Sequence, residues 1–194
     1  MSDVKEKFRT AIIHKSSEVF NHYGYKKTTM DDVAHAVGKG KSSIYYYFNS
    51  KEDIFKAVIE YEAEILKVEL LSSVEAADEP IEKIRNYVLT RMRVYKKVNN
   101  FYKALTSDML LHLNFIEETR IRYEMLEVEL VASIIEKGIE MNKFSIEEPK
   151  LAATAIVTAL RGLEKPLFNM NDEASFEFRL DQMLKFLFMG IIKR

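Results

Sequence analysis

The apolar residues of this chain recur every three or four positions along nearly its whole length, and this periodicity constrains the fold most strongly. Such spacing places apolar side chains on one face of an α-helix. The 194 residues include only six glycines and three prolines, which leaves little turn chemistry for a fold of many short strands. We therefore predict an all-α protein.

Capping residues and breaks divide this pattern into helices. Gly24 is placed to end the first helix, and Gly38 is placed to end a short second helix that Thr29 begins. Ser50 is placed as the cap of a long helix, and Asn142 as a left-handed cap. The expected helices cover about 4–23, 29–37, 42–48, 50–73, 80–98, 101–112, 115–141, 149–165 (ended by Pro166) and 173–192.

Composition limits the function classes. The chain has no cysteine, which removes disulfides, thiol catalysis and cysteine-bound metals. Its four histidines lack metal-ligand spacing, and no carboxylate pair stands out as an acid/base couple, so we expect no metal, no cofactor and no enzymatic activity. The apolar runs fall far short of the ~20 residues that span a bilayer, and the N-terminus is charged, so we expect a cytoplasmic protein without a membrane partner.

The charge is distributed unevenly. Residues 1–50 hold eight basic and five acidic residues, which leaves 21 of the 29 basic and 25 of the 30 acidic residues to the remainder. A basic N-terminal part on an acidic remainder fits a local DNA-contacting face.

Residues 28–52 have the pattern of two short helices joined by a glycine-containing turn. Thr29 and Asp32 have the spacing of a capping box at the start of the first helix. Successive helical residues lie ~100° apart, so three consecutive tyrosines cannot all face the core; we expect one to pack and two to be exposed. A base, small hydroxyls and aromatic hydroxyls on so short a helix suit the DNA major groove. On the second helix these groups are Lys41, Ser42, Ser43, Tyr45, Tyr46 and Tyr47.

The Gly-Lys-Gly-Lys-Ser segment at 38–42 also suggests a phosphate-binding loop. That loop requires a glycine five residues before Gly40, where this chain has His35, and it follows a strand rather than a helix. We reject this interpretation.

Residues 29–51 resemble the DNA-binding region of the TetR family of bacterial transcriptional regulators. The family pattern places Thr, Val/Ile-Ala, Ala and Gly before the turn, then Leu/Ile-Tyr-x-Tyr/His-Phe and Lys-Glu/Asp after it. The matching residues are Thr29, Val33, Ala34, Ala36, Gly38, Ile44, Tyr45, Tyr47, Phe48, Lys51 and Glu52. The chain departs from the pattern at Lys39 and Gly40, where the family has a hydrophobic residue and then Ser/Thr.

The resemblance implies two domains and a set of DNA contacts. Residues 1–50 would form a three-helix helix-turn-helix domain with a linking helix at 50–73, and residues 51–194 a larger helical domain for effector binding and dimerisation. We assign Tyr45 to a base or thymine methyl, and Tyr46 and Tyr47 to phosphates. The expected DNA-contacting residues are Thr28, Thr29, Lys39, Lys41, Ser42, Ser43, Tyr45, Tyr46, Tyr47 and Lys51.

The resemblance also implies a pliable apolar pocket in the middle helices and a dimer surface on the last two. The pocket candidates are Phe101, Tyr102, Met109, His112, Phe115, Tyr123 and Met125. The dimer candidates are Ala152, Ala155, Ile156, Ala159, Leu163, Leu180, Met183, Leu184, Leu187 and Phe188.

These features favour a homodimeric repressor that binds double-stranded operator DNA and is released from it by a partly apolar small molecule. The alternative is a small helical ligand carrier or enzyme without DNA binding. A carrier would not need the polar surface between Lys41 and Lys51, and no catalytic constellation supports an enzyme.

Overall fold

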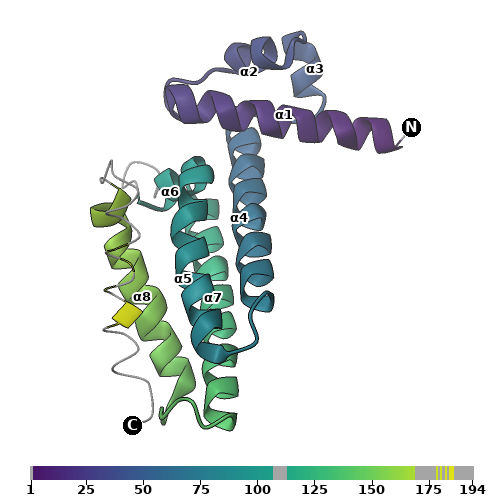
Figure 1. Cartoon of the computed structure of the whole chain (residues 1–194). Coiled ribbons are helices and arrows are strands. Elements are labelled where there is room, and N and C mark those ends of the chain that lie inside the picture. Colours follow the sequence, from purple (N-terminus) through teal and green to yellow (C-terminus); the bar gives the residue numbers. More distant parts are fainter. Residues whose placement is uncertain are drawn as a thin grey trace. The chain divides into compact units, whose positions relative to one another are not determined.

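The computed structural model describes residues 2–106 and 113–168, together with residues 178, 180, 182, 184 and 185. The all-α prediction is confirmed for this part of the chain (Figure 1). Its eight helices are α1 (Ser2–Tyr23), α2 (Met30–Val37), α3 (Lys41–Tyr45), α4 (Lys51–Glu75), α5 (Pro80–Lys97), α6 (Asn99–Thr106), α7 (Asn114–Glu140) and α8 (Pro149–Phe168).

The chain packs as two units. The first comprises the described residues of 1–65 and 98–120, and the second those of 66–97 and 121–194. This division falls inside α4 and α7, so α6 and the start of α7 group with the N-terminal helices. The predicted functional boundary at residue 50 stays a prediction.

An apolar core holds the first unit together. Ile12 and Phe20 of α1, Val33 of α2, Ile44 of α3 and Phe55 of α4 are all buried. The rings of Phe20 and Phe55 meet edge to face with their centroids 5.0 Å apart. Burial of each such side chain stabilises the fold by roughly 1.5–3 kcal/mol, and together they fix the positions of α2 and α3 on α1.

Two sequence predictions about this unit were wrong in detail. The helical spacing of 4–23 predicts Tyr23 on one apolar stripe with Ile12 and Phe20, but Tyr23 is exposed at the end of the helix, where its ring contacts His22. The second short helix ends at Tyr45 rather than Phe48. The backbone continues as a helical turn beyond Tyr45, because the Phe48 amide donates to the Ile44 carbonyl at 3.1 Å. Both side chains are buried, as their i, i+4 spacing predicts.

The later helices also differ from expectation at their ends. The helix expected at 101–112 begins earlier, at Asn99, and Pro166 does not end α8, which continues to Phe168. A proline crowds the carbonyl four residues earlier, here Gly162. Gly162 itself is open on its side-chain face, where an added methyl group would meet nothing within 4 Å. The left-handed cap at Asn142 is confirmed, and most of the predicted helix 173–192 lies outside the described residues.

The second unit has an apolar core that contains one ionic cluster. Buried apolar side chains come from α5, α7 and α8, among them Ile84, Ile135 and Val157. Gly138 of α7 lies directly against the buried ring of Phe144, where any larger residue would overlap that ring. In the described part of the chain, no helix is both long and apolar enough to cross a membrane.

Candidate nucleic-acid interface

The predicted capping box at the start of α2 is confirmed. The Thr29 hydroxyl accepts from the Asp32 amide at 3.2 Å, and the Asp32 carboxylate accepts from the Thr29 amide at 2.8 Å. The Thr29 hydroxyl also donates to that carboxylate at 2.7 Å. The side-chain hydrogen bond from Thr29, followed by the backbone one, lowers the pKa of Asp32 below its ordinary value. The start of α2 is therefore fixed by local chemistry.

The turn between α2 and α3 depends on Gly38. Its φ of 69° is left-handed, which favours glycine, and its amide donates to the His35 carbonyl at 3.0 Å. Gly40 caps α3 without a side-chain hydrogen bond, as expected from the departure of this chain from the family pattern. Lys39 and Gly40 are both exposed.

The three tyrosines divide as predicted, with two exposed and one packed. Tyr45 and Tyr46 are 45% and 66% exposed. Tyr47 is half-buried, with its ring edge to face against Phe8 of α1 at 5.2 Å and against Tyr46 at 5.0 Å. The end of α3 therefore presents two tyrosine side chains, each with a hydroxyl group, to solvent.

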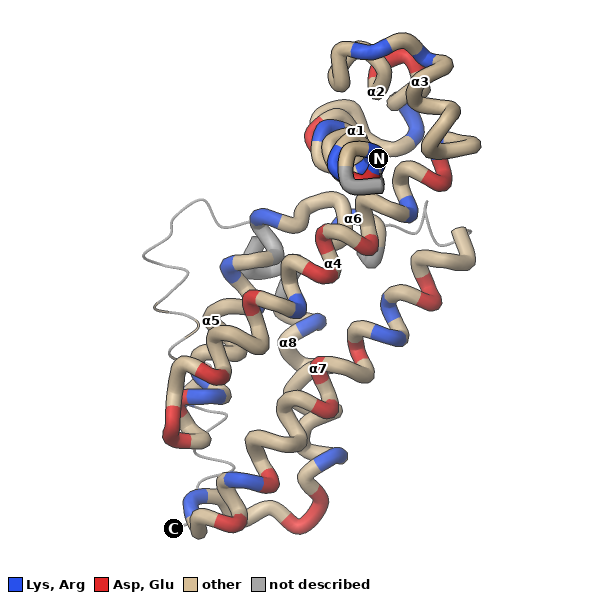
Figure 2. The backbone as a smooth tube through the Cα atoms, turned by 90° about the vertical axis from the view of Figure 1, so that its right-hand side faces the viewer, with Lys and Arg blue, Asp and Glu red and all other residues tan. Residues whose placement is uncertain are grey.

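Basic positions at this turn lie close to acidic positions of α2 (Figure 2). The Lys41 ammonium lies 2.9 Å from the Asp31 carboxylate, and both groups are exposed. The hydrogen bond to Asp31 raises the pKa of Lys41. A phosphate contact from Lys41 would compete with this ion pair.

A groove of about 550 Å³ lies between the first turns of α1 and the α3 surface. Hydroxyls, one lysine and aromatic rings line it, which is a chemistry suited to sugar and phosphate. The lining residues are Val4, Phe8, Lys39, Ser42, Ser43, Tyr46 and Tyr47.

Two of the predicted contacts have internal partners instead. Thr28 is 1% exposed, and its hydroxyl donates to the Gly24 carbonyl at 2.9 Å, so it holds the chain before α2 and is a poor candidate for DNA. The Lys51 ammonium donates to the Tyr25 carbonyl at 2.8 Å and lies over the Tyr25 ring. The position of Lys51 in the first turn of a helix, where its charge opposes the helix dipole, favours a phosphate nearby, but these internal contacts supply another explanation.

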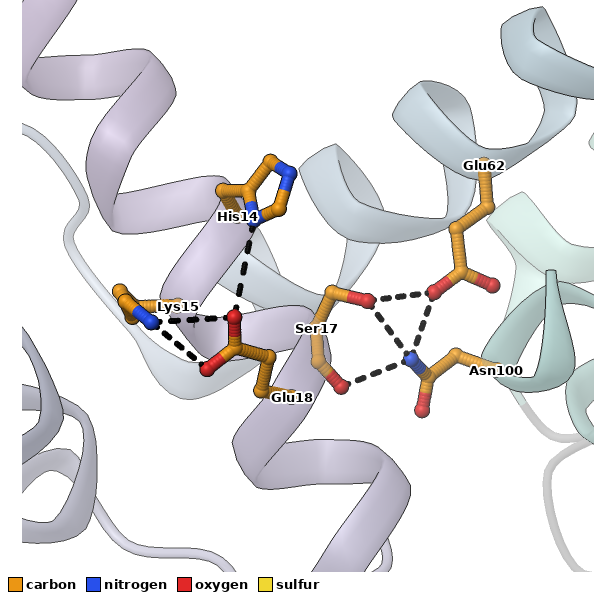
Figure 3. Close-up of polar contacts among 6 residues, drawn as sticks. All are labelled: His14, Lys15, Ser17, Glu18, Glu62 and Asn100. Atoms are coloured by element: carbon orange, nitrogen blue, oxygen red, sulfur yellow. Dashed lines mark hydrogen bonds and ion pairs between the residues drawn. The ribbon is translucent and has the colours of Figure 1, made fainter. Parts of the chain in front are cut away.

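A buried polar junction, which we did not predict, joins α1, α4 and α6 within the first unit (Figure 3). The Glu62 carboxylate accepts from the Ser17 hydroxyl at 2.7 Å, the Asn100 amide group at 2.6 Å and the Phe101 backbone amide at 2.9 Å. The sequence could have indicated this junction. Glu62 follows Phe55 by seven residues and Val58 by four, so it is a charged residue on the apolar stripe of α4.

The second unit contains a similar cluster. The Glu127 carboxylate accepts from the Tyr87 hydroxyl and from Arg91 Nε, each at 2.5 Å. Arg91 and Glu127 are 2% and 4% exposed. Arg91 follows the buried Ile84 by seven residues, so the sequence also placed this charge on an apolar stripe.

The structure describes only some of the predicted pocket residues. Phe101 and Phe115 are buried in the first unit, and Tyr123 is buried in the second. Met125 is 61% exposed, so it does not line an enclosed pocket within one chain. Met109 and His112, and the side chain of Tyr102, lie outside the described residues. No group of His, Asp or Glu suited to a metal ion occurs in the described part.

The predicted dimer residues fall into two groups. Ala155 and Ala159 are exposed on α8, and Ala152 and Leu163 are partly so. Ile156, Leu180 and Leu184 are buried within the chain itself, so they belong to its own core. Met183, Leu187 and Phe188 lie outside the described residues.

Comparison with known proteins agrees with this geometry. Residues 12–58 match the sequence model of the family described as "Bacterial regulatory proteins, tetR family". An HTH-type transcriptional regulator from the lacX 3' region of Lactococcus lactis is 24% identical over 84% of this chain and 82% of its own. A transcriptional regulator of Cytophaga hutchinsonii superposes with a TM-score of 0.77 at 26% identity, covering 94% of this chain and 97% of that one.

AibR, solved with isovaleryl coenzyme A and operator DNA, shares the fold with a TM-score of 0.70 at 17% identity, over 93% of this chain and 98% of its own. The helical fold and the α2–α3 motif define a DNA-binding transcriptional regulator. Over residues 12–58, this chain has the DNA-binding region of the tetR family of bacterial regulatory proteins.

Proposed function

We propose that this regulator is a homodimeric repressor that a small molecule releases from a pseudo-palindromic operator. The exposed hydroxyl-bearing face of α3, beside the groove that α1 borders, is the observation that carries the proposal. Two copies of α3 would enter successive major grooves about 34–36 Å apart. Ser43 and Tyr45 would contact bases, and Lys39, Tyr46 and Tyr47 would contact the backbone.

The effector is proposed to be partly apolar. AibR, a structural relative, was solved with both an acyl coenzyme A and operator DNA, which supports ligand control on this fold. A ligand shifts an equilibrium only through different affinities for the two states, so the effector must bind the DNA-free geometry more tightly. Phe101, Phe115 and Tyr123 are the described pocket candidates that are buried.

Operator binding can be tested with DNA from upstream of the protein's own gene. We expect the wild-type chain to shift this duplex more strongly than an unrelated duplex of equal length. Ser43→Ala and Tyr45→Ala should each weaken specific binding by about 1–3 kcal/mol and relax the base preference at one position.

Ser133→Ala serves as a control, because Ser133 is an exposed serine on α7. Unchanged specific affinity in both α3 variants would remove Ser43 and Tyr45 from the interface. A wild-type chain that binds a small molecule but shifts neither duplex would instead support the carrier alternative.

A further inference from the structure

Lys5, on the first turns of α1, lies beside the exposed tyrosine of the α3 surface. Its ammonium donates to the Tyr46 hydroxyl at 2.6 Å and lies 5.2 Å from the centre of the Tyr46 ring. Lys5 is 41 residues from Tyr46 in the sequence, so the α2–α3 motif alone could not have indicated this pair.

The charge of Lys5 is available in a way that the charges of Lys41 and Lys51 are not. Within the described part of the chain, no carboxylate lies within ion-pair distance of Lys5, whereas Lys41 is paired with Asp31 and Lys51 donates to backbone carbonyls. The hydrogen bond to Tyr46 raises the pKa of Lys5, so the group is charged at neutral pH.

The hydrogen-bond chemistry of the pair leaves donors for an anion. An ammonium has three N–H donors, of which the Tyr46 hydroxyl accepts one. Because that hydroxyl oxygen acts as an acceptor toward Lys5, its own proton can be donated elsewhere. A cation and a hydroxyl held side by side can both donate to the oxygens of one phosphate.

The groove next to the pair supports the same ligand. Lys39, Ser42 and Ser43 line it together with Tyr46, so the Lys5–Tyr46 pair borders a surface of hydroxyls and a second base. Glu6, next to Lys5 in the sequence, lies 3.8 Å from Arg9, and Asp31 of α2 is paired with Lys41.

We propose that Lys5 and Tyr46 together bind one phosphodiester of the DNA backbone in each half-site. The proposal rests on the proposed DNA-binding function and adds a contact from α1, outside the α2–α3 motif. Backbone contacts fix the register of a protein on DNA and carry no sequence information directly. This contact therefore positions α3 and leaves the base preference unchanged.

The test measures the dissociation constant of the full-length chain against salt concentration, on the upstream duplex and on an unrelated duplex. Each neutralised phosphate contributes about 0.9 to the slope of log K against log salt. Lys5→Gln should therefore reduce the magnitude of the slope by about 2 per dimer on both duplexes, and Lys5→Arg should retain most of it.

Lys7→Gln is the matched control. It removes the same charge from an exposed lysine about 200° further around α1, and it should leave the slope near the wild-type value. Tyr46→Phe should weaken binding less than Lys5→Gln, and its effect should shrink when Lys5 is already Gln. That non-additivity is the signature of a shared ligand.

The outcomes separate this inference from the proposed function. If the wild-type chain binds neither duplex, the proposed function fails. If it binds and Lys5→Gln keeps the wild-type slope, the Lys5–Tyr46 phosphate site is wrong while DNA binding stands. A lower melting temperature of Lys5→Gln with an unchanged slope would show that the pair only braces α1 against α3.

Discussion

Asp32 is a single side chain that makes the stability of the helix-turn-helix motif depend on pH in acid. Its pKa is lowered by the hydrogen bonds from Thr29, so its contribution to stability is fully present above the ordinary value of 3.8 and is lost as the pH falls through the lowered value. In Asp32→Asn, the free energy of unfolding should therefore fall less steeply than in wild type as the pH drops below about 4. Urea unfolding followed by circular dichroism at a series of pH values measures this free energy. The same pH dependence in wild type and Asp32→Asn would contradict the prediction.

Lys51 leads to a different expectation at the same scale. Its ammonium binds the carbonyl of Tyr25 before α2 and lies over that residue's ring. Lys51→Ala should lower the free energy of unfolding by about 1 kcal/mol, because these groups lose a charged donor. Denaturant unfolding measures the loss, with Lys26→Ala, an exposed lysine, as the control. An unchanged stability together with a reduced salt slope would restore Lys51 to the phosphate contacts.

Among the elements, the junction at Glu62 connects three helices of the first unit. Removing its carboxylate leaves the buried Asn100 side chain and the Phe101 amide without that acceptor. Glu62→Ala should therefore destabilise the protein by roughly 2–3 kcal/mol, and Glu62→Gln by less, because one acceptor oxygen remains. The exposed Glu64→Ala is the control on the same helix. Equal stability of Glu62→Ala and Glu64→Ala in thermal unfolding would show that the junction contributes little.

The small exposed residues of α8 lead to a prediction about assembly. Ala155 and Ala159 lie on its exposed face and leave room for a second helix. The double variant Ala155→Arg/Ala159→Arg should be a folded monomer with weak operator affinity, and Ser133→Arg on α7 should stay dimeric. Sedimentation at micromolar concentration distinguishes them, and a dimeric double variant would place the interface elsewhere. Leu184→Glu is unsuitable for this test, because Leu184 is buried within the chain and the variant should unfold.

For the whole molecule, the sequence predicted what local chemistry determines. The Thr29 capping box and the end of α2 at Gly38 depend on residues within a few positions of one another, and both were predicted correctly. Glu62 and Lys5 were missed because their partners lie 38 and 41 residues away, and only folding brings them together. Glu62 was still detectable as a charge on an apolar stripe, whereas Lys5 looked like any surface lysine.

One helix, α1, contributes both Lys5 beside Tyr46 and Ser17 beside Glu62. These residues are twelve positions apart, about 18 Å along the axis, and each added residue rotates one end against the other by ~100°. The number of residues between Lys5 and Ser17 is therefore restricted, because it sets both their separation and their relative rotation about the helix axis. One alanine inserted between residues 9 and 10 should weaken operator binding in a gel shift at least as much as Lys5→Gln does, whereas one inserted after Glu79, in the connection before α5, should be tolerated. Retained binding by the first variant would show that the two ends of α1 work independently.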